Sequence, residues 1–155
     1  FIVTLAGMLV FLTDVHSMGL DIAQGLQFTT AFVWNQNEET KAWSNRFNER
    51  HGAMPTMVQA GVYSAVTNYL KAVEETGTDD SDTVRAKLGE MTLNDMFVKG
   101  GKIAPNGSML HDMYLVEVKK PSESKSEWDL LNVISKIPAD QAYISMADTK
   151  CSLVN

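Results

Sequence analysis

A short polar cluster near the start of the chain is the strongest candidate for chemistry. Residues 13–17 read Thr-Asp-Val-His-Ser and directly follow an apolar run over residues 1–12. A carboxylate and an imidazole this close in sequence can cooperate in proton transfer, or they can hydrogen-bond the polar ends of a small ligand. The structural alternative is that Asp14 or Ser17 caps the next helix and that His16 is an ordinary surface residue. The pattern favours this structural role over catalysis, and binding without catalysis is the better functional alternative.

Three further side chains are candidates for ligand contact. Trp34 ends a run with the two-residue alternation of a β-strand, where an aromatic ring can line a cleft. Gln59 and Tyr63 lie one turn apart at the start of a helix rich in small residues, which let a ligand or another backbone approach closely. Packing in the interior is an equally good interpretation for each of the three. Trp43 and Trp128 are predicted to be core residues.

Known catalytic and metal-binding motifs are missing from the sequence. It contains no GxGxxG, Walker-type loop, HExxH, GxSxG or Cys-x-x-Cys pattern. Cys151 is the single cysteine, so neither a disulfide framework within the chain nor a multi-thiolate metal site can form. Asp79, Asp80 and Asp82 are most simply a solvated capping cluster, because a Ca²⁺ loop needs further oxygens at regular spacing. We therefore expect no catalytic residue, no metal and no cofactor.

The composition is that of an ordinary globular protein. The chain has 155 residues, of which 45% are hydrophobic, and its net charge is -6. No basic stripe is present, which argues against nucleic acid or an anionic membrane as a partner. The apolar run at the start is shorter than the roughly 20 residues of a membrane-spanning helix and lacks the features of a signal peptide. Because the chain opens on Phe1 inside this run, we expect a fragment of a longer protein.

The periodicity of the first half predicts alternating strands and helices. We expect a buried strand that ends at residues 13–14, which would place the polar cluster at the carboxyl end of a strand, where open α/β folds bind ligands. A short helix over 17–25 and a strand over 26–34 follow. A helix then begins with a capping box at Asn35 and closes at Gly52.

The second half continues the alternation, so the predicted class is α/β. A long helix opens at Pro55 and ends at Gly77, with its apolar face at Val58, Val62, Ala65, Val66, Tyr69 and Val73. The remaining expected elements are a short capped helix through Leu88, strand-like residues 92–98, a turn at 105–107, a strand over 111–119 that is apolar on both faces, a strand or helix over 128–137, and a turn-rich tail from Pro138.

Several stretches of the sequence resemble one known family. Leu9–Leu20, Ala23–Leu26 and Gln59–Val66 look like the periplasmic solute-binding proteins of branched-chain amino acid-type ABC transporters. Gly101–Gly107 and His111–Lys119 resemble the pattern of a proteobacterial subgroup of that family. The resemblance covers essentially the whole chain, but only the carboxyl-terminal part of such a protein.

The resemblance implies a type I periplasmic-binding-protein fold, in which two α/β lobes are joined by three crossing strands and close by a hinge motion. By this resemblance residues 1–51 belong to the second lobe, and residues 52–92 form a crossover segment that contributes a helix to the first lobe. Residues 93–155 return to the second lobe and end in a tail. Without the first lobe, the crossover helix should expose Val62 and Val66, together with Tyr69.

The same resemblance implies a function. The protein would be the substrate-binding component of an ABC importer, capturing an amino acid or a small organic or aromatic carboxylate by closure of two lobes in the periplasm. Its partners would be this ligand, the ABC permease subunits and the missing N-terminal lobe, but no nucleic acid. The residues expected to face the ligand are Thr13, Asp14, His16, Ser17, Trp34, Gln59 and Tyr63.

Each of these residues has an implied role. Asp14 would hold an ammonium or hydroxyl group, His16 and Gln59 would hydrogen-bond polar ends, and Trp34 and Tyr63 would stack on an apolar body. The donors that the family uses for the ligand carboxylate would lie in the first lobe. Two alternatives stay open: an extracellular ligand-sensing domain of a receptor, and a hydrolytic enzyme that uses Asp14 and His16. Cys151 has either a mate in missing sequence or a free thiol.

Overall fold

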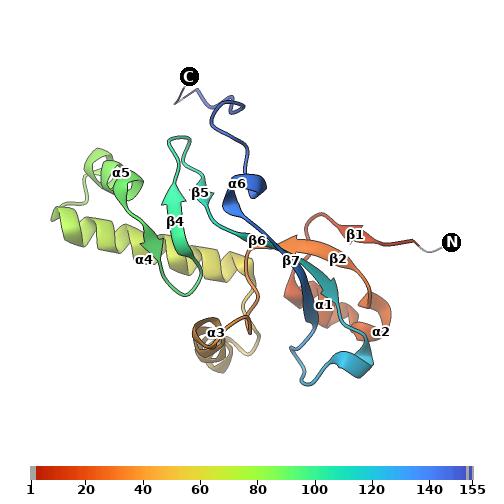
Figure 1. Cartoon of the computed structure of the whole chain (residues 1–155). Coiled ribbons are helices and arrows are strands. Elements are labelled where there is room, and N and C mark those ends of the chain that lie inside the picture. The colour runs from red at the N-terminus through yellow and green to blue at the C-terminus, as the bar shows by residue number, and fades with distance from the viewer. Residues whose placement is uncertain (1–2, 153, 155) are drawn as a thin grey trace. The chain divides into compact units, whose positions relative to one another are not determined.

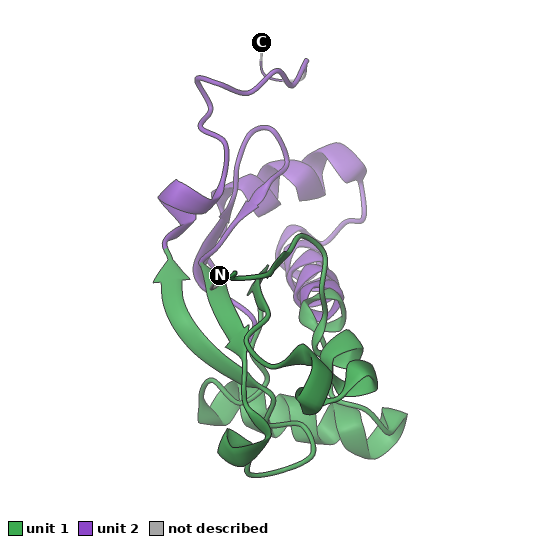
Figure 2. Cartoon of the chain, turned by 90° about the vertical axis from the view of Figure 1, so that its right-hand side faces the viewer, with its two compact units in different colours: residues 1–59, 113–137 green, residues 60–112, 138–155 purple. Residues whose placement is uncertain are grey.

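The chain forms two compact units. The computed structural model describes residues 3–152 and residue 154. Unit 1 consists of the chain up to Gln59 together with residues 113–137, and unit 2 consists of residues 60–112 and the tail from Pro138 (Figure 2). The backbone therefore passes from one unit to the other three times, after residues 59, 112 and 137.

These crossings do not coincide with the segment boundaries expected at 51/52 and 92/93. Residues 93–112 and the tail lie in the same compact unit as most of the long helix. Which lobe of a complete binding protein each unit represents stays a prediction.

Unit 1 is built on a four-stranded mixed sheet in the order β1-β2-β6-β7 (Figure 1). The two-residue strand β1 (Ala6–Gly7) pairs in parallel with β2 (Gln27–Thr30). β2 runs antiparallel to β6 (Met113–Val118), which runs antiparallel to β7 (Leu131–Ile137). The segment that could have been either strand or helix is thus a strand, and the strand predicted over 111–119 is confirmed.

The long strand predicted at the start is wrong. Its last residues instead form helix α1 (Leu12–Met18), in which Leu12 and Val15 face the core at helical spacing. Gly19, with a φ of 78°, separates α1 from the short helix α2 (Leu20–Ala23). An unbroken apolar run does not distinguish a strand from a helix. The buried residues Leu12 and Val15 are three apart, which is the spacing of a helix and not of a strand.

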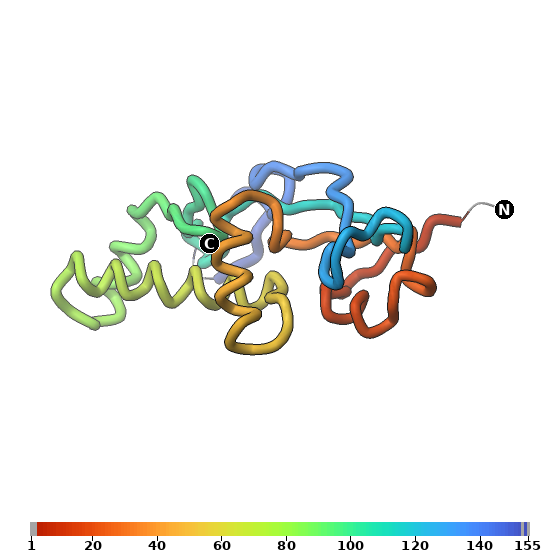
Figure 3. Tube along the Cα trace, turned by 90° about the horizontal axis from the view of Figure 1, so that it is seen from below, coloured from red at the N-terminus to blue at the C-terminus, as the bar shows by residue number. Residues whose placement is uncertain are grey.

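Helix α3 (Glu38–His51) follows β2 after an irregular segment, because the strand ends at Thr30 rather than at Trp34. Its capping box is two residues later than predicted. Asn37 Oδ1 accepts a hydrogen bond from the backbone N–H of Thr40 at 2.9 Å, and the Thr40 hydroxyl accepts one from the Asn37 N–H at 3.1 Å. Gly52 ends α3 in the left-handed conformation, as predicted, and the chain then turns towards α4 (Figure 3).

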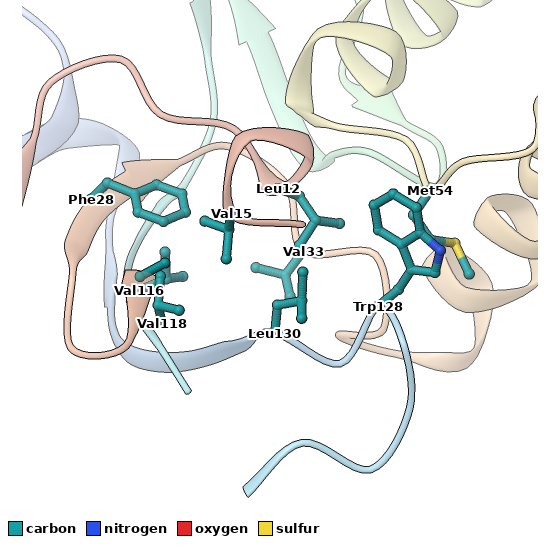
Figure 4. Packing of buried hydrophobic residues seen from close by; sticks show 10 residues of the cluster. Leu12, Val15, Phe28, Val33, Met54, Val116, Val118, Trp128 and Leu130 are labelled. Atoms are coloured by element: carbon teal, nitrogen blue, oxygen red, sulfur yellow. The ribbon is translucent and has the colours of Figure 1, made fainter. Parts of the chain in front are cut away.

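The core of unit 1 packs α1 and α2 against the sheet (Figure 4). Val116 and Val118 of β6 are fully buried on one face of the sheet, whereas the other residues of the strand are only half-buried. The expectation that both faces of this strand are covered is therefore met on one face only within the described residues. Trp43 and Trp128 are both buried, as predicted for core residues. The cluster comprises Leu12, Val15, Ala23, Phe28, Val33, Met54, Val116, Val118, Trp128 and Leu130.

Unit 2 combines two helices with a small antiparallel sheet in the order β3-β4-β5. The helices are most of α4 (Met57–Thr76) and α5 (Ser81–Glu90), which Asp80 caps. The predicted turn at residues 105–107 joins β4 to β5. The remaining elements are the strands β3 (Leu93–Asn94), β4 (Lys99–Ile103) and β5 (Met109–Leu110), and the short helix α6 (Ala139–Ala142) of the tail; the 3₁₀ turn η1 (Pro121–Glu123) belongs to unit 1.

Helix α4 buries the face opposite to the one that its apolar periodicity indicates. Its buried residues are Ala60, Ser64, Asn68 and Ala72. The Ser64 hydroxyl and the Asn68 amide both donate to Asp95 Oδ2, at 2.6 and 2.8 Å, so a carboxylate of the same unit holds this face. The apolar face is exposed, as the family resemblance predicts: Val62 is 59% exposed, Val66 52% and Tyr69 43%. Among the described residues, no helix combines the length and apolarity needed to cross a membrane.

Two glycine substitutions test how α3 ends. Gly52→Ala should lower the free energy of unfolding by about 1 kcal/mol, because an alanine side chain disfavours the left-handed backbone, where the φ of Gly52 is 81°. The matched control is Gly89→Ala in α5, where an added Cβ meets nothing within 4 Å and alanine favours the helix. It should raise the stability by about 0.5 kcal/mol. Urea unfolding of the protein that carries this chain measures both changes in stability. Equal changes in the two variants would contradict the left-handed backbone of Gly52.

Candidate functional site

The polar cluster predicted as a binding loop lies on helix α1 rather than beyond it. Asp14 is the third residue of the helix, and its Oδ2 accepts a hydrogen bond from the Phe11 backbone N–H at 2.9 Å. Asp14 therefore caps the first turn of its own helix, and its side chain is exposed. Thr13 is half-buried and Ser17 is exposed.

His16 is held against the core of unit 1. Its ring stacks on that of Trp128, with 3.9 Å between the ring centroids and 7° between the planes. Its Nε2 lies 3.0 Å from Glu127 Oε1. The imidazole is therefore fixed by an aromatic face and a carboxylate, which are contributed by a segment distant in sequence.

Trp34 contacts the same segment through a different atom. Its indole Nε1 donates a hydrogen bond to the Trp128 carbonyl oxygen at 2.9 Å, and its ring packs on the edge of the core cluster. The structure thus brings His16 and Trp34 together around Trp128. Trp34 combines the two roles that the sequence left open, because it is partly buried in the core and partly exposed.

A buried ion pair holds the segment that carries Trp128. Lys119 Nζ lies 2.6 Å from Asp129 Oδ1, and the two side chains are only 13% and 12% exposed. The other oxygen of Asp129 accepts from the Lys125 backbone N–H at 3.0 Å. Burial by itself would raise the pKa of Asp129, but the hydrogen bonds from Lys119 and Lys125 and the Lys119 charge outweigh it and lower this pKa below its usual value.

A hollow of about 380 Å³ opens between α1 and this segment, within unit 1. His16 and Glu127 stand on its wall, so their polar ends are accessible to a small molecule. The hollow is also lined by Gly19, Leu20, Ser124 and Ser126.

Gln59 serves as a helix cap. Its Oε1 accepts hydrogen bonds from the Thr56 backbone N–H at 2.9 Å and from the Thr56 hydroxyl at 2.7 Å. In the part of the chain that the structure describes, the Nε2 amide of Gln59 makes no hydrogen bond and can serve a ligand. Tyr63, one turn further along α4, is 43% exposed and belongs to unit 2, whereas the other six predicted site residues belong to unit 1.

The sequence predicts Trp128 only as a core residue, and no residue pattern marks the segment Glu127–Asp129 as part of the site. The sequence signal is weak, since Lys119 and Asp129 are ordinary charged residues on either side of a loop and only the fold makes them partners. Among residues 3–152 and 154, no three His, Cys, Asp or Glu side chains gather closely enough to hold a metal.

The chain matches a known protein family and is similar to several solved structures. A family model described as "Periplasmic binding protein" matches residues 2–125. The chain is similar to a periplasmic binding protein from Burkholderia mallei, with 46% identity and a TM-score of 0.91 over 94% of this chain and 38% of that one. It is also similar to a branched-chain amino acid ABC transporter periplasmic ligand-binding protein from Burkholderia xenovorans LB400, with 39% identity and a TM-score of 0.92 over 97% and 40%.

A more distant structure has the same fold. The solute-binding protein of an ABC transporter from Rhodopseudomonas palustris BisB5, solved with 3,4-dihydroxybenzoic acid, has 20% identity and a TM-score of 0.70 over 83% of this chain and 35% of that one. No curated protein matches the chain. The chain thus spans about two-fifths of the length of the structures that it resembles, and the predicted α/β fold of type I periplasmic binding proteins is confirmed.

The buried pair can be tested by removing its cation. Lys119→Met should lower the free energy of unfolding by about 2 to 3 kcal/mol, because it leaves the Asp129 carboxylate buried without its charge partner. Lys87→Met is the matched control, since Lys87 pairs with Glu75 at the same 2.6 Å but on the surface. That substitution should leave the urea midpoint nearly unchanged. Similar losses in both variants would show that the Lys119–Asp129 pair contributes no more to the free energy of unfolding than a surface pair does.

The lowered pKa of Asp129 predicts a pH dependence of stability. The charged form stabilises the fold fully above the unfolded carboxyl pKa of about 3.9, and this contribution is lost as the pH falls through the lower pKa of the folded state. The stability advantage of the parent over Asp129→Asn should therefore shrink below about pH 4. Urea unfolding of both proteins between about pH 6 and pH 2 measures it, and a difference independent of pH would refute the assignment.

Proposed function

The chain belongs to the periplasmic binding protein family, as its sequence predicted, and from this membership we propose that it is part of the substrate-binding component of an ABC importer. In this proposal the protein captures a small molecule outside the cytoplasm by closure of two lobes and presents it to the permease subunits. The observation that carries the proposal is the match of nearly the whole chain, at 46% and 39% identity, to two proteins of this kind.

The exposed face of α4 supports the proposal that the first lobe of the protein covers this helix. Val62, Val66 and Tyr69 form an apolar stripe on a helix that is otherwise well anchored in unit 2. Such a stripe favours burial against another part of the same protein. The three passages of the chain between the compact units support the same architecture, with closure by movement of one lobe against the other.

We propose an amino acid or a small organic or aromatic carboxylate as the ligand. Trp34 offers a partly exposed indole ring, His16 a fixed imidazole and Gln59 a free amide N–H group, which suit an apolar body with polar ends. No lysine or arginine is among the proposed contact residues, so the ligand carboxylate would be held by the first lobe. Two neighbours illustrate the range, since one is named for branched-chain amino acids and another holds 3,4-dihydroxybenzoic acid.

We propose binding rather than catalysis for Asp14 and His16. Asp14 already accepts a backbone hydrogen bond within α1, and the His16 Nε2 faces Glu127 rather than Asp14. A general base works best when its nitrogen is directed at the reacting group, and here both side chains are engaged in holding the fold. These contacts favour a binding protein over a hydrolase. Nothing in the described residues specifically favours a receptor domain.

A ligand screen tests this proposal. Amino acids and aromatic acids are added separately to the protein that carries this chain, and the melting temperature is recorded; a member of one class should raise it. Trp34→Ala should then weaken binding about tenfold or more in calorimetry, because a rigid aromatic contact is lost. His51→Ala, on the exposed end of α3, serves as the control and should bind as the parent does.

The recovered ligand decides between binding and catalysis. It should return chemically unchanged after prolonged incubation with the protein. Conversion of the ligand that disappears in His16→Ala would establish the hydrolase instead. If no compound of either class raised the melting temperature, the proposed ligand class would be wrong.

A further inference from the structure

We propose that His111 and Tyr143 form a latch that couples two of the three chain crossings and thereby positions the two lobes for closure. The proposal rests on the proposed two-lobe function. It concerns contacts that lie within unit 2, next to the points where the chain enters and leaves that unit. His111 and Tyr143 act here as positioning residues and touch no ligand.

The two crossings in question are neighbouring strands. The chain leaves unit 2 after residue 112 into β6 and returns to it after residue 137 at the end of β7. Met113 pairs with Ile137, and Tyr114 with Lys136, in antiparallel register. On the unit 1 side, the two crossings are therefore already joined by the backbone ladder of the sheet.

On the unit 2 side, the same two crossings are joined by side-chain hydrogen bonds. Tyr143 Oη lies 2.6 Å from His111 Nε2, and His111 Nδ1 lies 2.9 Å from the Asp112 carbonyl oxygen. A carbonyl oxygen only accepts, so we assign the imidazole proton to Nδ1. Nε2 then accepts from the Tyr143 hydroxyl. The residue just before β6 is thus bonded to the tail that follows β7.

Packing around the two rings strengthens the latch. The His111 ring centroid lies 5.1 Å from that of Phe97 and 5.4 Å from that of Tyr143, both at steep angles. Burial raises the pKa of Tyr143, which keeps its hydroxyl protonated as a donor.

A second bond joins the same two crossings. Asp112 Oδ1 accepts a hydrogen bond from the Ala139 backbone N–H at 3.1 Å, at the start of α6. The segments before β6 and after β7 are therefore bonded at two places within a few residues of the crossings. Strands joined on both sides of a crossing can bend together as one ribbon, but they cannot slide or twist independently.

The test removes one hydroxyl and measures both the latch and the hinge in ligand-free protein. Tyr143→Phe keeps the ring packing and loses the hydrogen bond to His111. Tyr114→Phe is the matched control, because in the described part of the chain the Tyr114 hydroxyl makes no hydrogen bond although it lies on β6 itself. Both are made in a Cys151→Ser background with spin labels at the exposed positions Asn45 in unit 1 and Asp82 in unit 2.

Two readouts are expected to change in Tyr143→Phe but not in the control Tyr114→Phe. Amide hydrogen exchange over residues 139–143 should become about fivefold faster, the factor expected for one lost hydrogen bond. The distribution of distances between the labels should become broader. Asp112→Ala, which removes the acceptor for Ala139, should change both readouts in the same direction.

Each outcome decides the matter. Faster exchange with a broader distribution supports the latch. Faster exchange with an unchanged distribution shows a local contact without influence on the lobes and overturns the proposal, as does no change in either. Since no ligand is used, failure of the ligand screen would bear on the proposed function and not on this result.

Discussion

The candidate site depends on one interaction, the buried ion pair between Lys119 and Asp129. Lys119 directly follows β6, and Asp129 lies two residues before β7. The second oxygen of Asp129 also accepts a hydrogen bond from the backbone N–H of Lys125, in the loop between them. One carboxylate thus holds both ends and the middle of a loop whose only regular structure is a single 3₁₀ turn. Trp128, adjacent to Asp129, is fixed as a result, with its ring against His16 and its carbonyl oxygen on Trp34.

Structural and ligand-binding roles of the polar residues are compatible in this chain. Asp14 and Gln59 each use one side-chain oxygen to cap a helix and keep a second polar group uncommitted. A side chain that is already held by a capping bond loses little rotamer freedom when a ligand binds, so less binding energy is lost to ordering. The two interpretations that the sequence left open for these residues are therefore complementary, because the cap orients the group that a ligand would meet.

Local signals in the sequence predicted the elements that depend on local chemistry. The left-handed glycine after α3, the acidic cap of α5 and the alternation of β6 were all found from residue type and spacing. The prediction of a long strand at the start of the chain was wrong because an unbroken apolar run suits a strand and a helix equally. The prediction of which face of α4 is buried failed for a different reason. The small and polar residues of that face are held by Asp95, which is remote in sequence. The contact of His16 with Trp128 is likewise long-range, and no spacing rule connects the two.

The three crossings differ in their capacity to bend. The one after residue 59 lies inside α4, whose first turn is capped in unit 1 by Thr56 and Gln59 and whose middle is bonded to Asp95 in unit 2. Its continuous ladder of i to i+4 hydrogen bonds resists a local bend. Val62 and Val66 of its apolar stripe are already nearly half buried, so covering each of them fully would contribute about 1 to 1.5 kcal/mol, similar to one hydrogen bond. Contacts on both faces of the helix would therefore hold it in place. In a two-lobe protein, bending is then left to the paired strands after residues 112 and 137, where the contacts around His111 lie.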